Sequence, residues 1–155
     1  GCETCTNVCP PHAITHEDDR EKGMRIIRRD YGKCIFCGQC EEHCITGKGV
    51  KLSDKIYDMA NFDRKDSVEY QEKELLICKN CGAVITTKEH MIFMHKKLGP
   101  KAFSNIMNLN VLNEKLRLAP KEDTEVDLSE ELKRRDMFNI LCPNCLREVL
   151  VKNMK

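Results

Sequence analysis

Eleven cysteines occur in this sequence, and all of them fall into groups with intervals of three or four residues. The densest run, residues 34–44, has the sequence CIFCGQCEEHC, with three cysteines three residues apart and a fourth four residues later. Thiolates in this spacing are typical ligands of a cubane [4Fe–4S] cluster, in which three bind one cluster and the fourth crosses to a neighbouring cluster. The run therefore predicts a second cluster-binding loop elsewhere in the chain.

The second loop lies at the start of the sequence, where Cys2, Cys5 and Cys9-Pro10 follow the same spacing with one cysteine fewer. The missing cysteine would stand three residues before Cys2. We therefore expect that the sequence begins inside a cluster motif and that the first ligand lies upstream of Gly1. A site with only three cysteines, holding a [3Fe–4S] or a labile cluster, is the alternative.

Crossed ligation divides the seven N-terminal cysteines between two [4Fe–4S] clusters. One cluster is expected to bind Cys34, Cys37, Cys40 and Cys9. The other is expected to bind Cys2, Cys5, Cys44 and the upstream cysteine. Proline follows the last cysteine of the first loop, whereas Ile45 stands at that position in the second loop and keeps the backbone N–H that proline lacks.

Two further cysteine pairs have the C-x-x-C spacing of metal-binding knuckles, one followed by Gly82 and the other containing Pro143. Together they supply the four thiolates of a tetrahedral zinc site, and Gly82 permits the backbone conformation that closes such a turn. A third iron–sulfur cluster and a redox dithiol are alternatives, but two separate pairs favour a closed structural Zn²⁺. Its expected ligands are Cys78, Cys81, Cys142 and Cys145.

The composition indicates a thin apolar core. Hydrophobic residues make up 41% of the 155 residues, but that share includes the cysteines, and there are five Phe, three Tyr and no Trp. Metal sites are therefore expected to supply stability that burial cannot. With 26 Lys+Arg against 25 Asp+Glu, no net charge points to nucleic acid. Grouped cysteines, without a membrane-length apolar run or a signal peptide, favour a reduced, cytoplasmic environment.

The segments between the cysteines predict an α+β fold. Residues 13–16 alternate apolar and polar side chains as a short half-buried strand does. Residues 24–29 are a second strand candidate, with Ile26 and Ile27 as their apolar content, and a charged loop ending at Gly23 joins the two. Residues 50–53 repeat, after the second loop, the strand that follows the first. This internal duplication is the plan of a bacterial-type 2[4Fe–4S] ferredoxin-like domain.

The later part of the chain predicts a zinc-ribbon-like domain whose knuckles are separated by a long helical insertion over residues 86–136. Thr86-x-x-Glu89 has the pattern of a capping box, and residues 102–118 carry apolar side chains at helical spacing. An acidic loop and a short charged helix from Asp127 are expected next. Residues 138–141 and 146–151 are expected to be strands around the second knuckle.

These patterns divide the chain into three parts. The boundary falls in a charged stretch, since seven of the eleven residues from Asp63 to Lys73 carry a charge. We expect a two-cluster ferredoxin domain over residues 1–60, a linker over 61–77 and a Cys₄ zinc-binding domain over 78–155.

Residues 9–14 (CPPHAI), residues 30–42 (DYGKCIFCGQCEE) and Leu52-Ser53-Asp54 followed by Met59-Ala60 resemble one known family. It is the two-cluster ferredoxin subunit of complex I, and more closely its counterpart in formate hydrogenlyase and membrane-bound energy-converting [NiFe] hydrogenases. Residues 78–82 with the helix start after them resemble the Cys-rich tail of the formate hydrogenlyase subunit. Ile45 and the wide separation of the two knuckles depart from the family pattern.

The resemblance implies a non-catalytic electron-transfer subunit of an oxidoreductase complex, peripheral on the inner face of the cell membrane and attached only through partner subunits. Electrons would come from an electron-input subunit, either a formate dehydrogenase module or ferredoxin. They would pass through both clusters to the hydrogenase small subunit, beside its large subunit. The residues leave open two alternatives, an iron–sulfur and zinc interaction or regulatory module, and a free ferredoxin.

Overall fold

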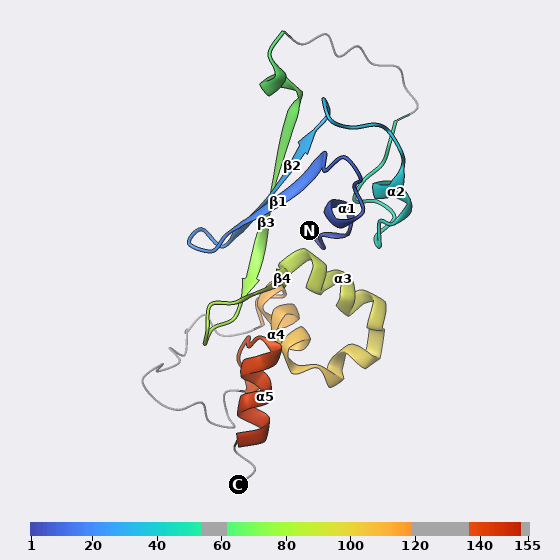
Figure 1. Ribbon diagram of the computed structural model, residues 1–155. Helices are drawn as coiled ribbons and strands as arrows, with labels where there is room; N and C mark the ends of the chain where they lie inside the picture. The colour runs from blue at the N-terminus through green and yellow to red at the C-terminus, as the bar shows by residue number, and fades with distance from the viewer. Residues whose placement is uncertain (54–61, 119–136, 153–155) are drawn as a thin grey trace. The chain divides into compact units, whose positions relative to one another are not determined.

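The computed structural model describes residues 1–53, 62–118 and 137–152 (Figure 1). Across these ranges the sheet has four strands in the order β1 (Ile14–Asp19), β2 (Met24–Asp30), β3 (Val68–Ile77) and β4 (Val84–Thr87). The chain divides into two compact units. Unit 1 comprises residues 1–19 and 24–73, and unit 2 comprises residues 20–23 and 74–155.

Unit 1 is built on an antiparallel hairpin of β1 (Ile14–Asp19) and β2 (Met24–Asp30). The sequence predicted both strands, and this prediction is confirmed. Ile14 pairs with Arg29 in the register of the hairpin. Its buried apolar side chains are Ile14 and Ile27, and Ala13 directly before β1 is also buried. These few buried side chains match the thin core that the composition predicts.

Arg25 lies on β2 and is only 2% exposed. Its Nε and Nη2 donate hydrogen bonds of 2.6 and 2.7 Å to the Asp18 carboxylate, while Nη1 lies 2.6 Å from Glu3 Oε1. Nη1 also donates to the carbonyl oxygen of Gly1 at 2.9 Å. A buried guanidinium is tolerated when its donors are matched in this way. The contacts attach the first cysteine loop, which contains Glu3, to the hairpin.

The sequence predicted a linker over residues 61–77, but the structure has a 3₁₀ turn, η1 (Arg64–Ser67), followed by the strand β3 (Val68–Ile77). Asp63 caps the turn by accepting the N–H of Lys65 at 3.0 Å. The charged residues that favoured a linker lie along the strand, with Glu69, Glu72 and Glu74 exposed. Dense charge alone therefore does not identify a linker, because an exposed strand also carries charged side chains.

Residues 50–53 form no strand, contrary to the sequence prediction. The N–H of Leu52 instead donates to Glu41 Oε2 at 2.8 Å, and Lys51 Nζ lies 2.8 Å from Glu41 Oε1. A side-chain carboxylate thus takes the place of a neighbouring strand as the hydrogen-bond partner.

In unit 2, the end of β3 pairs antiparallel with β4 (Val84–Thr87), and the register shifts between Leu76 and Ile77. Helix α3 (Lys88–Leu98) follows, then η2 (Gly99–Ser104) and α4 (Ile106–Lys115). Thr87 caps α3 by accepting the N–H of His90 at 3.3 Å. The cap is therefore Thr87, and the predicted start at Thr86 was one residue early. No helix within the described ranges is long and apolar enough to span a membrane.

Helix α5 (Pro143–Lys152) occupies residues 146–151, where the sequence predicted a strand, so that prediction is wrong. Pro143 stands at the first helical position. A backbone N–H at this position has no partner within the helix, so the lack of one in proline costs no hydrogen bond. Cys145 and Val149, four residues apart, are both buried, as one face of a helix requires. Residues 138–141 form no strand either, and the acidic loop and short helix expected around Asp127 lie outside the described residues.

We expect Arg25→Ala to lower the free energy of unfolding by about 2 kcal/mol, because Asp18 and Glu3 lose a buried partner. The loss stays below that of a fully enclosed ion pair, because the two carboxylates keep 22% and 38% of their surface exposed. For a chain of this length, this loss of stability corresponds to a fall of about 5 °C in the melting temperature. The melting temperature can be measured from the absorbance of the iron–sulfur chromophore. The exposed Arg20→Ala is the matched control, and an equal effect of both substitutions would contradict the role of Arg25.

Candidate metal centres

The two N-terminal cysteine loops share one backbone conformation. Each contains a single helical turn, α1 (Thr4–Asn7) in the first loop and α2 (Gln39–Glu42) in the second. Each turn is preceded by a residue in the left-handed region, Glu3 with φ +66° and Gly38 with φ +78°. Both of these residues directly follow the first cysteine of a C-x-x-C pair.

The chain also reverses in the same way after the last cysteine of each loop. The N–H of His12 donates to the carbonyl of Cys9 at 3.1 Å, and the N–H of Gly47 donates to the carbonyl of Cys44 at 2.9 Å. His12 and Gly47 both have positive φ, +49° and +63°. This conformation is uncommon for a residue other than glycine, so its presence at His12 indicates that the loop demands it. The agreement supports an internal duplication.

Thiols of the two loops lie close enough to interact electrostatically. Burial raises the pKa of Cys40, and repulsion from Cys34 and Cys9 raises it further. Burial also raises the pKa of Cys5, and repulsion from Cys2 adds to the rise. Cys9 belongs to the first loop, yet it acts on a thiol of the second. Side chains from both loops therefore meet in one region of unit 1.

A cavity of about 160 Å³ lies beside two of these thiols. Its walls are mainly apolar, and low polarity around iron and sulfur limits the access of water. Thiols at the wall and an apolar surround fit the chemistry of an iron–sulfur cluster. The lining includes Cys34, Cys40, Ala13, Ile14, Val50 and Leu52.

Several hydrogen-bond donors surround the Cys44 thiol. Burial raises its pKa, but hydrogen bonds from the Thr46 side chain and from the backbone N–H groups of Thr46, Gly49 and Val50 outweigh burial and lower the pKa to about 6. The Sγ lies 3.2 Å from Thr46 Oγ1. These donors stabilise the thiolate, which is the form that binds iron.

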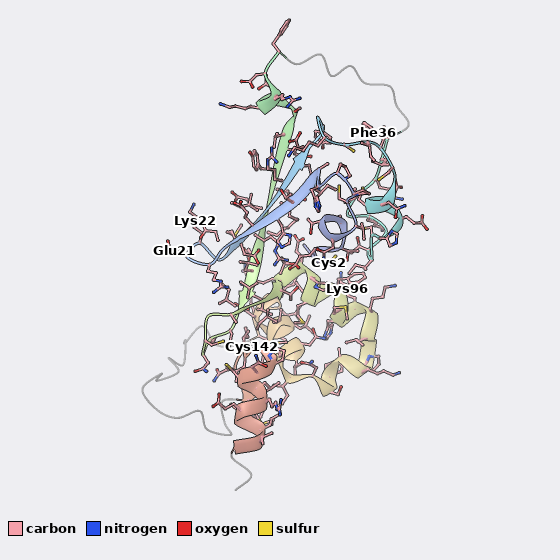
Figure 2. The ribbon with its side chains drawn as sticks, viewed as in Figure 1. Cys2, Glu21, Lys22, Phe36, Lys96 and Cys142 are labelled. Carbon is pink, nitrogen blue, oxygen red and sulfur yellow. The ribbon has the colours of Figure 1, made fainter. Side chains whose placement is uncertain are left out.

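The four later cysteines converge in unit 2. The Sγ atoms of Cys78, Cys81, Cys142 and Cys145 all lie within 4.8 Å of one another, and those of Cys81 and Cys142 are 3.6 Å apart. Tetrahedral zinc with Zn–S bonds of about 2.3 Å requires sulfurs about 3.8 Å apart. Cys142, labelled in Figure 2, directly precedes α5. The four-cysteine cluster therefore has the dimensions of a metal site.

The electrostatics of the four-cysteine cluster favour a cation. Burial raises the pKa of Cys78, but nearby backbone N–H groups outweigh burial and lower it to about 7. At Cys145 a hydrogen bond from Asn80 lowers the pKa, yet burial and the other three thiols raise it to about 12. Four such close thiols cannot all ionise without a positive charge among them. A metal ion supplies that charge.

The surrounding chain holds this cluster in place. Cys78, Leu141, Cys142, Cys145 and Val149 form one buried core, with Ala83, Ile85, Met137 and Leu146 packed against it. The N–H of Gly82 donates to the carbonyl of Cys78 at 3.0 Å, and Gly82 has φ +66°. The Asn80 side-chain amide donates to Cys145 Sγ at 3.2 Å. Metal ligands and apolar core are thus the same group of residues.

The duplicated loops define the class of this part of the chain. Residues 1–48 match the family described as "4Fe-4S dicluster domain". The N-terminal part is accordingly an iron–sulfur electron-transfer domain of ferredoxin type, and the chain also contains a four-cysteine site that can bind a metal.

Two similar proteins are subunits of quinone oxidoreductases. The chain is 36% identical over 78 residues to NADH-quinone oxidoreductase subunit I 2 of Geobacter metallireducens, covering 48% of this chain and 58% of that protein. It is 33% identical over 70 residues to NAD(P)H-quinone oxidoreductase subunit I of Gloeobacter violaceus, covering 42% and 32%.

A third similar protein is a ferredoxin-type protein from a different system. The chain is 40% identical over 53 residues to the methylamine utilization ferredoxin-type protein MauM of Methylorubrum extorquens, covering 32% of this chain and 24% of that protein. The chain thus spans between a quarter and three-fifths of the length of these three relatives. The N-terminal domain is distantly related to all of them.

Four contacting residues escaped the sequence analysis. Thr4, Thr46 and Asn80 each contact a cysteine sulfur. Arg25 anchors the first loop. Thr46 follows Ile45, the position that departs from the family pattern. This departure could have indicated that the loop has an unusual contact there. The other three carry no signal, because a threonine or an asparagine within a C-x-x-C pair and an arginine on a strand are ordinary surface residues in most sequences.

Replacing Cys145 with Ser removes one of four converging thiolates. We expect the purified protein to lose one metal ion per chain without losing iron, as measured by plasma mass spectrometry. Asn144→Ser, an exposed change in the same turn, is the matched control and keeps the ion. Retention of the full metal content in Cys145→Ser would contradict the site.

Proposed function

We propose that this chain is a non-catalytic subunit that relays single electrons through two [4Fe–4S] clusters toward the small subunit of a membrane-bound [NiFe] hydrogenase complex. The observation that supports the relay most directly is the pair of duplicated loops with Cys9 beside the thiols of the second loop. Clusters that exchange ligands between adjacent loops lie close together, as transfer of electrons between them requires.

The proposed ligands follow the crossed pattern of the two loops. One cluster binds Cys34, Cys37, Cys40 and Cys9. The other binds Cys2, Cys5 and Cys44. When bound, each cluster accepts and releases one electron, and the chain holds its thiolates and limits the access of water.

In the proposed division of the chain, residues 1–60 are the ferredoxin domain and residues 78–155 are a zinc-binding domain. Zn²⁺ bound by Cys78, Cys81, Cys142 and Cys145 would be structural, since four protein ligands leave no open position for a substrate. The convergence of the four sulfurs within 4.8 Å supports this role.

Two similar proteins named as quinone oxidoreductase subunits support partner subunits for this chain. The resemblance to formate hydrogenlyase and energy-converting hydrogenases points to the hydrogenase small and large subunits as partners. Electrons would arrive from a formate dehydrogenase module or from ferredoxin. The chain would then lie on the cytoplasmic face of the membrane, attached through these partners.

A cationic groove in unit 1 is a suitable place for the electron donor to dock. It has a volume of about 520 Å³, and its one acidic lining residue, Asp30, lies 3.0 Å from Arg28. Lys33, which directly precedes the proposed ligand Cys34, lines the groove. Opposite charge accelerates the association of redox partners, so we propose that an acidic surface of the donor binds here. The groove's cations are Arg28, Lys33, Arg64 and Lys65.

Reversing two groove charges tests this docking. We expect Lys33→Glu with Arg64→Glu to slow reduction by an acidic ferredoxin about tenfold at low ionic strength, measured by stopped-flow absorbance. The difference should shrink as salt screens the charges. Lys96→Glu with Lys101→Glu makes the same change in net charge on unit 2 and serves as control. Equal slowing by both pairs would contradict a docking site at the groove.

Metal analysis of the anaerobically prepared full-length protein tests the relay itself. We expect about eight iron and one zinc per chain, reversible low-potential EPR signals and copurification with hydrogenase-like subunits. Cys37→Ser should remove the cluster shared with Cys9 and stop hydrogen evolution by the complex. Unchanged hydrogen evolution in that variant would contradict the relay.

The same preparation distinguishes the two other functions that the sequence leaves open. Eight iron without a stable partner favours a free ferredoxin. Metal that does not change redox state, together with tight binding of a regulatory partner, favours an interaction module.

A further inference from the structure

Two threonine hydroxyls contact cysteine sulfurs in unit 1, one in each loop. Thr46 Oγ1 lies 3.2 Å from Cys44 Sγ, and Thr4 Oγ1 lies 3.4 Å from Cys2 Sγ. A sulfur bound to iron has no proton, so in each pair the hydroxyl is the donor. Both sulfurs belong to the same proposed cluster, because crossed ligation joins Cys44 of the second loop to Cys2 of the first.

The hydroxyl of Thr46 is oriented by its own hydrogen bonds. Its Oγ1 accepts the N–H of Gly49 at 3.0 Å and the N–H of Lys48 at 3.3 Å. These two bonds occupy the acceptor positions of the oxygen and leave its proton for the Cys44 sulfur.

The loop also packs too closely for a larger residue at position 49. A Cβ at Gly49 would lie 3.2 Å from Thr46 Oγ1 and 3.3 Å from Cys44 Sγ. Such contacts would push the hydroxyl and the sulfur apart. Glycine at position 49 therefore preserves the geometry of the hydrogen bond.

The equivalent positions of the other loop carry no hydroxyl. Cys9 corresponds to Cys44, and Pro10-Pro11 corresponds to Ile45-Thr46, so the position of Thr46 is taken by a residue with neither hydroxyl nor N–H. The position of Thr4 is taken in the second loop by Gln39. The two loops thus share one backbone conformation but differ at the residues that contact sulfur.

A hydrogen bond donated to a ligand sulfur raises the reduction potential of an iron–sulfur cluster, because it stabilises the additional negative charge of the reduced state. We infer that Thr46 and Thr4 set the cluster of Cys2, Cys5 and Cys44 at a higher potential than the cluster of Cys34, Cys37, Cys40 and Cys9. This inference rests on the proposed function. Electrons then enter at the Cys34 cluster and collect at the Cys44 cluster, from which they leave.

Redox titration of the full-length protein with EPR detection tests the inference. We expect two midpoint potentials in the wild type, with the higher one lost from Thr46→Val and replaced by a lower value. At a fixed potential, the ratio of reduced to oxidised cluster should fall about tenfold, which for a one-electron couple is about 59 mV. Thr46→Ser keeps the hydroxyl and should keep the potential. Thr4→Val should shift the same midpoint in the same direction.

Two measurements assign the shift to its cluster. Cys37→Ser removes the other cluster, so the remaining signal should have the higher potential and should move in the double variant with Thr46→Val. Resonance Raman spectra of Thr46→Val alone should show a stronger Fe–S(Cys) bond, because the hydrogen bond no longer withdraws charge from sulfur. This measurement needs no second substitution.

The outcomes separate this inference from the proposed function. A wild type without two redox-active clusters contradicts the proposed function. Two clusters whose midpoints both stay unchanged in Thr46→Val contradict the inference alone. A shift confined to the lower midpoint also contradicts it, because the hydroxyl would then act on the electron-donating cluster.

Discussion

Thiolates held close together repel one another, and a cation among them reverses that repulsion. In unit 2 four sulfurs lie within 4.8 Å, and three of the cysteines that carry them belong to the buried core together with Leu141 and Val149. A chain with few aromatic residues has little other apolar surface to bury. A metal ion bound by the four cysteines would therefore supply stability that a larger core would otherwise provide.

Unit 1 uses the same chemistry in a duplicated form. The backbone repeats from one loop to the other, including a left-handed residue after the first cysteine of each C-x-x-C pair and a reversal after the last. The side chains around the cysteines do not repeat between the two loops. Arg25 anchors only the first loop, and Thr46 bonds to sulfur only where the other loop has Pro11. Duplication thus provides two sites of one shape, and substitutions around them provide the chemical difference.

The predictions that failed share a physical cause. A linker was predicted over residues 61–77 because charge is dense there, yet β3 places Glu69, Glu72 and Glu74 toward solvent. A strand was predicted over residues 146–151, where four of six residues are apolar, yet this stretch lies within helix α5. In both places the local composition suits more than one structure, and packing against the rest of the unit selects between them. The hairpin strands β1 and β2 were predicted, β1 from the alternation over residues 13–16 and β2 from the apolar Ile26 and Ile27.

The sequence by itself determined which residues can bind metal and the grouping of those residues, because ligand spacing within a loop is a local property of the chain. It also determined the resemblance to dicluster ferredoxins. Only the tertiary structure decided which groups surround each sulfur. Cys78 and Cys145 are distant in sequence, and the hydrogen bond from Asn80 to Cys145 arises only when their knuckles meet. Hydrogen bonds and burial depend on such distant neighbours, and so does the difference between the two cysteine loops.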